Sequence, residues 1–420
     1  MVEPLTVWLE RLERRTPEAQ IRLGLERVGT VLNRLPGARP SCPVITVGGT
    51  NGKGSVVAML ESIYGCAGYR TLAYTSPHLL DFSERVRVDG QPAAESVLAE
   101  ALAEVEQRRG TEALTYFEHV TLAALVVARS MGPDVVLLEV GLGGRLDAVN
   151  AIDPDVAVIT SIGLDHIEWL GGTRRSIARE KGGIARAGRP LIVGERRPPR
   201  GWIAELAAGG ADLSLAGRDF HWRRAGRRLR LMAGEETLDL PPPRLAGAHQ
   251  WGNAACAVMA VRMLDRRLPV ATEALANGLS AVQLPGRLQR IASRPEIWLD
   301  VAHNAQAARV LAAALGPKTG PATAVFSALA GKDVAAIGQA LAGRFDRWLV
   351  PNLAGNRARD AAEVAGTLQD APVGGVVEAV ESVAQALDTA FARTPAAGRI
   401  VVFGSFRTVA EAWPLIQQRE

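Results

Sequence analysis

Hydrophobic residues in the first half of the chain fall into short apolar runs that alternate with stretches of helical periodicity. The run at 44–47 predicts a buried strand, and the apolar positions from Val56 to Ile63 predict one face of a following helix. Further strands are expected at 71–74, 135–140, 156–160 and 190–193. Helices are expected at 4–35 with a break near Pro17, 93–109, 119–131 and 172–187. This alternation predicts an α/β fold with a mostly parallel sheet.

The pattern changes after residue 195 and then resumes, which predicts a second domain. Residues 195–245 are rich in Arg, Pro and Gly, and 282–286 have the character of a linker. Beyond the linker, strands are expected at 297–301, 323–326, 347–350, near 376 and at 399–403, with helices at 305–314, 333–343, 360–369 and 380–393. We therefore predict two domains, over 1–284 and 285–420, the second a smaller Rossmann-like α/β domain.

A glycine-rich turn joins the first strand to its helix. Glycines let backbone N–H groups approach an anion, and the helix N-terminus adds partial positive charge, so this context favours a phosphate-binding loop. Lys53 can neutralise phosphates and Ser55 can offer a hydroxyl to Mg²⁺. Gly54 separates these two residues, so the P-loop pattern is imperfect and a plain glycine-rich turn stays as the alternative. The residues predicted to bind ATP in this mononucleotide-binding P-loop domain are Thr50, Asn51, Gly52, Lys53, Gly54 and Ser55.

An acid interrupts the apolar strand 135–140. Glu139 lies at the carboxyl end of this strand, just before the glycines of 141–144. A buried carboxylate is costly unless it is paired or binds a metal. Its place near the phosphate loop is what a Mg²⁺ ligand of the Walker B kind requires.

Composition narrows the class of protein. The 420 residues suffice for two or three domains, and the formal net charge of +4 permits anionic substrates without requiring nucleic acid. Three scattered cysteines, without metal spacing, favour a reducing cytoplasm. The N-terminus has no apolar core of the signal-peptide kind, and no uncharged apolar run reaches the ~18 residues of a membrane span. A cytoplasmic protein without membrane or nucleic-acid partners is expected.

Ten motifs, taken together and in order, resemble those of the Mur ligase superfamily, and more closely its folylpolyglutamate synthase/dihydrofolate synthase branch. They are GTNGKGS, TSPHL, TYFE, LEVGLGGRLDA, GLDH, EKGG, HQWGNAA, PGR, DVAHN and FGSFRTVAEA. The resemblance implies an ATP-dependent ligase that adds L-glutamate to dihydropteroate and to the glutamate tail of tetrahydrofolates, through an acyl phosphate. It also implies a monomer.

The resemblance implies two Mg²⁺ sites. Ser76 and Glu139 match ligands of the first, and His166 with Lys181 match ligands of the second, where a CO₂-derived carbamate would turn Lys181 into an anion. From the residues alone, Ser76 could instead cap a turn and Lys181 could be an ordinary helical lysine. Lys53, His166, Lys181 and His303 are the catalytic candidates.

The resemblance also implies substrate contacts. The pteroate-binding candidates are Thr115, Tyr116, Phe117, Glu118, Leu146, Asp147 and Ala148. The remaining ATP-binding candidates are Asn253, Arg287 and Asp300, and the glutamate-binding candidates are His303 and Ser405. Helix capping stays as the alternative for Asn253 and Ser405, and an acid favoured at a helix start stays as the alternative for Glu118.

Three other functions are also compatible with the sequence. The chain could be a folylpolyglutamate synthase only, or a Mur-type ligase acting on a peptidoglycan precursor, although it has no separate UDP-binding domain ahead of residue 44. It could also be a P-loop ATPase switch that binds a macromolecule. Residues 218–231 form a basic stretch for which a solvated antiparallel hairpin is favoured over a nucleic-acid patch, and a weak attraction for anionic polyglutamate tails is a hypothesis.

Overall fold

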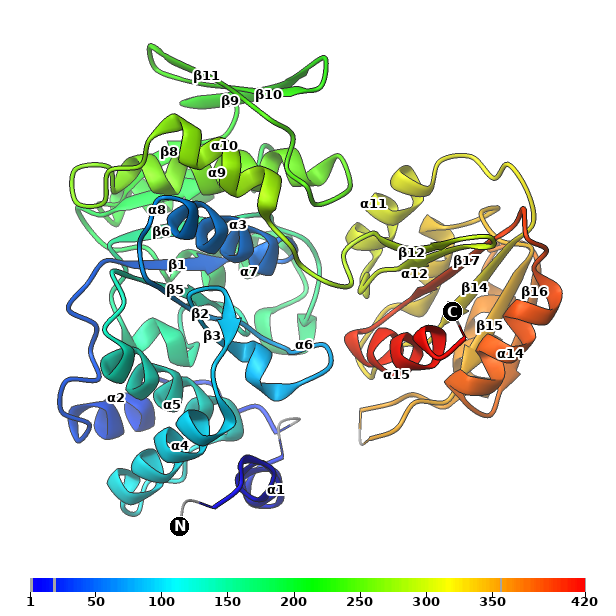
Figure 1. The fold of residues 1–420 in the computed structure, drawn as a ribbon, viewed down its shortest axis with the longest axis horizontal. Helices are drawn as coiled ribbons and strands as arrows, with labels where there is room; N and C mark the ends of the chain where they lie inside the picture. Colours follow the sequence, from blue (N-terminus) through cyan, green and yellow to red (C-terminus); the bar gives the residue numbers. More distant parts are fainter. Residues whose placement is uncertain (1–2, 18–19, 356, 420) are drawn as a thin grey trace. The chain divides into compact units, whose positions relative to one another are not determined.

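The computed structural model describes residues 3–17, 20–355 and 357–419 and divides into two compact units (Figure 1). The first unit comprises the described residues up to Gly163, together with Trp169–Arg244 and Gln250–Gln283. The second comprises Leu164–Glu168, Leu245–His249 and the described residues from Leu284 onward. The predicted α/β class is confirmed in both units. Two short segments from the N-terminal part of the sequence thus belong to the second unit.

The first unit is built on an eight-stranded sheet of order β4-β3-β2-β5-β1-β6-β7-β8. Its strands are β1 (Val44–Gly48), β2 (Thr71–Tyr74), β3 (Val86–Val88), β4 (Gln91–Pro92), β5 (Val135–Glu139), β6 (Val156–Ile159), β7 (Pro190–Val193) and β8 (Asp212–Leu215). Neighbouring strands pair in parallel except at one edge, where β3 pairs antiparallel with both β2 and β4. Strands β1, β2, β5 and β6 are buried along their whole length, as Val-, Ile- and Leu-rich strands of a covered parallel sheet should be.

The helices of the first part of the chain follow the predicted alternation, with shifted ends. They are α1 (Leu5–Arg15), α2 (Glu26–Asn33), α3 (Lys53–Cys66), α4 (Glu95–Arg109), α5 (Tyr116–Met131), α6 (Ile167–Leu170), α7 (Arg174–Gly182), α8 (Trp202–Ala208), α9 (His249–Met263) and α10 (Thr272–Ala281). The break expected near Pro17 within 4–35 is found, since α1 ends at Arg15, but α2 begins only at Glu26; residues 18 and 19 of that stretch lie outside the described residues. The helix expected over 172–187 ends at Gly182, where two glycines weaken helix propagation.

A three-stranded antiparallel sheet follows the large sheet in sequence. It consists of β9 (Phe220–Ala225), β10 (Arg228–Ala233) and β11 (Glu236–Leu240), and the predicted basic hairpin is confirmed. Trp222 of β9 lies against α9, where a Cβ added to Gly252 would be 2.9 Å from the indole. The glycine therefore permits close packing of this small sheet on the helix.

The second unit contains a six-stranded sheet of order β12-β13-β17-β14-β15-β16. Its strands are β12 (Gln289–Ser293), β13 (Glu296–Leu299), β14 (Ala322–Phe326), β15 (Arg347–Pro351), β16 (Val376–Val380) and β17 (Arg399–Phe403), and its helices are α11 (Ala305–Leu315), α12 (Val334–Ala340), α13 (Ala361–Asp370), α14 (Val383–Arg393) and α15 (Phe406–Gln417). Only β12 runs antiparallel among these strands, and it was not predicted. Helices α14 and α15 lie in front of the sheet in Figure 1 and pack against each other.

An aromatic cluster forms part of the core of this unit. The ring centroids of Phe326 and Phe403 lie 5.0 Å apart, and Phe345 meets Trp348 edge-on at 5.0 Å. Such pairs stabilise a core beyond their buried area. Among the described residues of both units, no helix combines the length and the apolar character needed to cross a membrane.

Candidate active site

The phosphate loop is held in one conformation by glycines and by the neighbouring loop. Gly49 and Gly52 have φ values of 140° and 93°, and a Cβ on Gly49 would lie 1.9 Å from the Thr160 hydroxyl. The Thr50 N–H donates to the Ser161 carbonyl at 2.8 Å, and the Asn51 N–H donates to the Ser161 hydroxyl at 3.0 Å. Because a side chain at either glycine would clash or strain the backbone, the sequence adopts this loop only with glycine there.

Lys53 begins α3, directly after the turn. Its Nζ donates to the carbonyls of Gly49 and Thr50, at 3.3 and 3.5 Å, so the side chain folds back over the loop. Ser55 is buried, and its hydroxyl accepts from Gln250 Nε2 at 3.2 Å. A cation on the loop and a helix N-terminus behind it form an arrangement suited to a polyphosphate.

Asn253 lies beside the same turn in α9. Its Nδ2 donates to Gln250 Oε1 at 2.8 Å, and a Cβ on Gly52 would lie 2.6 Å from Asn253 Oδ1. The structure therefore brings Asn253 and the phosphate loop together, although they are 200 residues apart in sequence. It lies inside α9 rather than at its start, so the capping alternative does not describe it.

The predicted ligands of the first metal meet at the carboxyl edge of the sheet. Glu139 ends β5 opposite Val47 of β1, is 6% exposed, and accepts from the Ser76 N–H at 3.4 Å. Lys181 is also buried, and its Nζ donates to the Gly49 carbonyl at 3.0 Å. Ser76 thus lies just after β2 and Glu139 ends β5, while Lys181 contacts the residue that follows β1. Within the described ranges, no group of three or more His, Cys, Asp or Glu side chains forms a metal site.

The TYFE segment has a strong structural role at the start of α5. The Glu118 N–H donates to the Thr115 hydroxyl at 3.2 Å, and the Thr115 N–H donates to Glu118 Oε2 at 2.7 Å, which is a capping box. Arg27 Nη2 donates to Glu118 Oε1 at 2.7 Å. The Glu118 carboxylate is therefore engaged at both oxygens, as the helix-start alternative requires.

The aromatic residues of the same segment pack on neighbouring loops. Phe117 lies 6.0 Å from the Tyr74 ring and so close to Gly141 that a Cβ there would be 2.5 Å from its Cζ. Arg85 lies over the Tyr116 ring at 5.7 Å. The glycine of the 141–144 loop therefore lets an aromatic face reach the carboxyl edge of the sheet.

The Asp147 carboxylate lies inside the loop after β5 and hydrogen-bonds to the backbone of that loop. One carboxylate oxygen accepts from the Leu142 N–H at 2.7 Å and the other from the Val149 N–H at 3.1 Å, while the side chain is 3% exposed. Burial raises the pKa of Asp147 to about 6, although the two N–H groups and the charge of Lys53 oppose the shift. Leu146 and Ala148 flank it, and the Leu146 carbonyl accepts from the Gly24 N–H at 3.3 Å.

This raised pKa predicts that stability falls as pH rises from about 4 to about 6. In that window the native state holds a proton that the unfolded chain has released, so the native state is destabilised relative to the unfolded chain. A shift from 3.8 to about 6 corresponds to about 3 kcal/mol of unfolding free energy. Urea unfolding between pH 4 and pH 7.5 should show this slope in wild type and a flatter one in Asp147→Asn, which would carry a pH-independent loss of one acceptor. Parallel curves for the two proteins would contradict the prediction.

Several predicted residues of the second unit follow β13 and β17. Both oxygens of Asp300 accept backbone N–H bonds at 2.8 Å, from Leu288 and Ala302, and burial raises its pKa. The guanidinium of Arg287 lies 4.9 Å from the Phe406 ring centroid. Ser405 is buried and its hydroxyl accepts from the Thr408 N–H at 3.0 Å, so in this structure it is the N-cap of α15.

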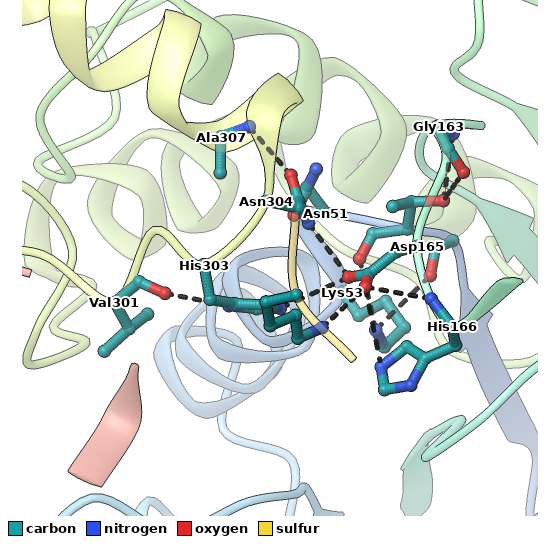
Figure 2. A network of polar contacts seen from close by, with 12 residues as sticks. Asn51, Lys53, Gly163, Asp165, His166, Val301, His303, Asn304 and Ala307 are labelled. Carbon is teal, nitrogen blue, oxygen red and sulfur yellow. Dashed lines mark hydrogen bonds and ion pairs between the residues drawn. The ribbon is translucent and has the colours of Figure 1, made fainter. Parts of the chain in front are cut away.

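The Asp165 carboxylate lies at the centre of a polar network that the sequence did not predict (Figure 2). Its Oδ1 accepts from Lys332 Nζ at 2.5 Å, and its Oδ2 accepts from Asn304 Nδ2 at 3.0 Å and lies 3.4 Å from His303 Nε2. All of these residues belong to the second unit. Burial opposes ionisation, but His303, Lys332 and His166 together hold the pKa of Asp165 far below its ordinary value. The GLDH motif drew attention to His166, and its aspartate carried no signal of its own.

A cavity of about 300 Å³ lies where β13, β14 and β17 begin, at the sheet edge opposite these residues. Three of the cations that line it are already engaged: Arg399 donates to Glu296 at 2.8 Å, Lys318 pairs with Asp346, and Arg344 donates to a backbone carbonyl. None of the predicted site residues lines it. The chemistry of the predicted site therefore lies elsewhere.

Comparison with known families agrees with this architecture. Residues 47–261 match the Mur ligase middle domain, and residues 286–406 match the Mur ligase glutamate ligase domain. The two α/β units, the first with its predicted phosphate loop at the carboxyl edge of the sheet, are thereby identified as those of a Mur ligase. Relatives that match over nearly the whole chain identify the family within the Mur ligases.

The Escherichia coli K12 dihydrofolate synthase/folylpolyglutamate synthase is 42% identical over 99% of this chain and 96% of its own length. The structure of E. coli FolC in complex with DHPP and ADP matches with a TM-score of 0.93 at 42% identity, covering 99% of this chain and 98% of that one. A bifunctional folylpolyglutamate synthase/dihydrofolate synthase with Mn, AMPPNP and L-glutamate bound matches with a TM-score of 0.90 at 40% identity, over 99% and 98% of the two chains. The chain belongs to the dihydrofolate synthase/folylpolyglutamate synthase family.

Proposed function

We propose that this protein is an ATP-dependent ligase that joins L-glutamate to the carboxylate of dihydropteroate and to the glutamate tail of tetrahydrofolates. The observation that carries the proposal is the phosphate loop 49–55 at the carboxyl edge of a parallel sheet, in a chain of this family. Similar structures hold ADP, or AMPPNP with Mn and L-glutamate, which supports the use of ATP and a divalent metal here.

The chemistry requires the residue types found around the loop. A carboxylate is a poor electrophile at neutral pH, so ATP first transfers its γ-phosphoryl group to it and forms an acyl phosphate. Lys53 and the N–H groups of the loop would stabilise the charge of the transferred phosphoryl group, without becoming covalently bound to it. The amine of glutamate then attacks the acyl carbon and phosphate leaves.

The buried Glu139 fits a hard cation. Its carboxylate lies among buried residues beside Ser76, and carboxylate and hydroxyl oxygens are the ligands that Mg²⁺ prefers. Ser76 and Glu139 would hold one ion, and His166 with a carbamylated Lys181 would hold a second. Bound there, Mg²⁺ would supply positive charge to the phosphate oxygens. Both the second site and the carbamate are part of the proposal.

The substrates are assigned to different parts of the chain. Residues 1–284 would form the ATP-binding domain and 285–420 the glutamate-ligase domain. The pteroate would lie among the aromatic residues Tyr116 and Phe117 and the 146–148 loop, with Phe117 held against Gly141. Asn253 would contact adenine, Arg287 and Asp300 would contact the nucleotide, and His303 with Ser405 would contact glutamate.

Arg287 offers a test of the nucleotide assignment. The Arg287→Ala enzyme is expected to lose about tenfold or more in kcat while its affinity for dihydropteroate changes less than about twofold, because the guanidinium serves the phosphoryl group and not the pterin. Steady-state kinetics and equilibrium binding of dihydropteroate measure the two quantities. Arg290→Ala, an exposed neighbour in β12, is the matched control, and an unchanged kcat in Arg287→Ala would contradict the assignment.

The activity itself is tested by ADP release from the purified protein with Mg²⁺-ATP and L-glutamate. Dihydropteroate is added to one sample and tetrahydrofolate to another. Stimulation in both supports the bifunctional proposal, and stimulation by tetrahydrofolate alone restricts it to chain extension. No stimulation in either, with ATP binding intact, would overturn the folate assignment.

A further inference from the structure

Asp165 lies in a five-residue segment, 164–168, that belongs to the second unit although both flanking parts of the chain belong to the first. Its side chain is 8% exposed, and so is that of its partner Lys332. Besides Lys332, Asn304 and His303, its carboxylate accepts from the His166 N–H at 2.9 Å. Donors from three separate stretches of sequence therefore converge on one buried carboxylate.

Asn304 is fixed in orientation by this arrangement. Its Oδ1 accepts from the Ala307 N–H at 2.9 Å and caps α11, so its Nδ2 must face the other way, toward Asp165. The capping bond and the bond to Asp165 use opposite ends of one amide. A flipped amide would lose both.

His303 is fixed in the same manner (Figure 2). Its Nδ1 lies 2.9 Å from the Val301 carbonyl, which can only accept, so Nδ1 carries a hydrogen. Its Nε2 faces Asp165 Oδ2. Both ring nitrogens are thus directed at acceptors, and the plane of the imidazole is set by Asp165 together with the loop after β13.

We propose that Asp165 is a positioning residue that holds His303 and Lys332 in the orientation in which they receive L-glutamate. The inference rests on the proposed function, and it adds a residue that acts through others. A free amino acid with two carboxylates needs cationic and N–H groups fixed in space, and Asp165 fixes two such groups in the loops that follow β13 and β14. Without Asp165, Lys332 would lose the carboxylate that lies 2.5 Å from its Nζ, and breaking a buried ion pair is costly.

The structure also defines what Asp165 should not affect. Thr50 and Asn51 are held by Ser161 through bonds in the first unit that do not involve Asp165. Replacing Asp165 should therefore disturb the glutamate step and leave ATP binding intact. This difference separates positioning from a general loss of stability.

Asp165→Asn is the most informative substitution because it keeps the shape of the side chain. Its oxygen can still accept from Lys332, but its amide nitrogen would face Asn304 Nδ2, which is also a donor. We expect the ratio kcat/KM for L-glutamate to fall about tenfold or more, the scale of a lost hydrogen bond between charged groups, with the KM for ATP changed less than about twofold. In a double-mutant cycle, Asp165→Asn with Lys332→Met should be no worse than the poorer single variant.

Glu61→Gln is the matched control. Glu61 is another buried carboxylate, paired with Arg87 at 2.9 Å in the first unit. This variant should lower the melting temperature without a selective change in the KM for glutamate. Equal losses for ATP and glutamate in Asp165→Asn, or kinetics indistinguishable from wild type, would overturn the proposal.

A measurement independent of activity completes the test. In ¹⁵N-histidine-labelled protein, the ring N–H of His303 at Nε2 should be protected from exchange in wild type and unprotected in Asp165→Asn, with His303→Gln providing the assignment. Protection together with a wild type that shows no glutamate-dependent ADP release would overturn the proposed function, and with it the role toward glutamate, and would leave only the orientation of the His303 ring by Asp165. An unprotected ring in wild type would refute the positioning role whatever the activity.

Discussion

A Lys53→Met enzyme is expected to turn over about a thousandfold or more slowly than wild type while folding normally. Lys53 Nζ lies over the phosphate loop, donating to the Gly49 and Thr50 carbonyls. In the proposed reaction its charge would act on a phosphoryl group whose negative charge is spread over its oxygens as it moves. Losses of this order follow when a positioned cation is removed from a phosphoryl-transfer site.

Single-turnover ADP formation and equilibrium binding of ATP separate the two effects of Lys53→Met. The chemical step should be lost, whereas ATP affinity should fall less, since the loop N–H groups and the helix N-terminus remain. Lys318→Met, which removes a lysine paired with Asp346 at the surface, is the matched control and should keep wild-type rates. A Lys53→Met enzyme with more than a tenth of wild-type kcat would refute the assigned role.

The strand, the glycine-rich turn and the helix around Lys53 could be predicted from sequence because all of their determinants are local. The apolar strand, the glycines and the helix that begins at Lys53 lie within 23 consecutive residues, 44–66. Glu139 was also predictable, since an acid at the end of an apolar strand is unusual and parallel strands end at the same edge of a sheet. The sheet pairs Val47 with Glu139, which is the register that places the acid beside the loop.

Contacts between distant segments were not predictable in the same way. Glu118, which was predicted to accept hydrogen bonds from the pteroate, is paired with Arg27, 91 residues away in sequence. The sequence did not indicate Arg27 as its partner. Asp165 meets its partners from 139 and 167 residues away. Hydrophobic periodicity indicates which helices and strands form, but it does not indicate which loops come into contact in the fold.

Short or edge elements were missed for a different reason. Strands β3 and β4 have three and two residues, too few for alternation to be distinguished from chance. Strand β12 is only partly buried, so its hydrophobic pattern is weak. For Ser405, the alternative role of a helix cap was predicted from sequence, and it describes the observed hydrogen bond.

Lys181→Ala is expected to lose about a hundredfold or more in kcat and to recover part of it when acetate or propionate is added. Lys181 is 5% exposed, and its Nζ lies 3.0 Å from the Gly49 carbonyl, at the start of the phosphate loop. Carbamylation would add CO₂ to the ε-amine of Lys181 and would convert the side chain into an anion. The alanine variant leaves room for a small carboxylate, which would take the place of the proposed carbamate.

The carbamate can also be sought directly, by ¹³C NMR of wild type equilibrated with ¹³C-bicarbonate, with Lys181→Arg as the spectroscopic control and Lys318→Ala as the activity control. A carbamate signal lost in Lys181→Arg, together with rescue by carboxylates, would identify an anion at this position. Loss of activity without signal or rescue would assign the function to the ammonium group and its bond to Gly49. Full activity in Lys181→Ala would exclude both roles, because a side chain this close to the loop would then contribute only packing.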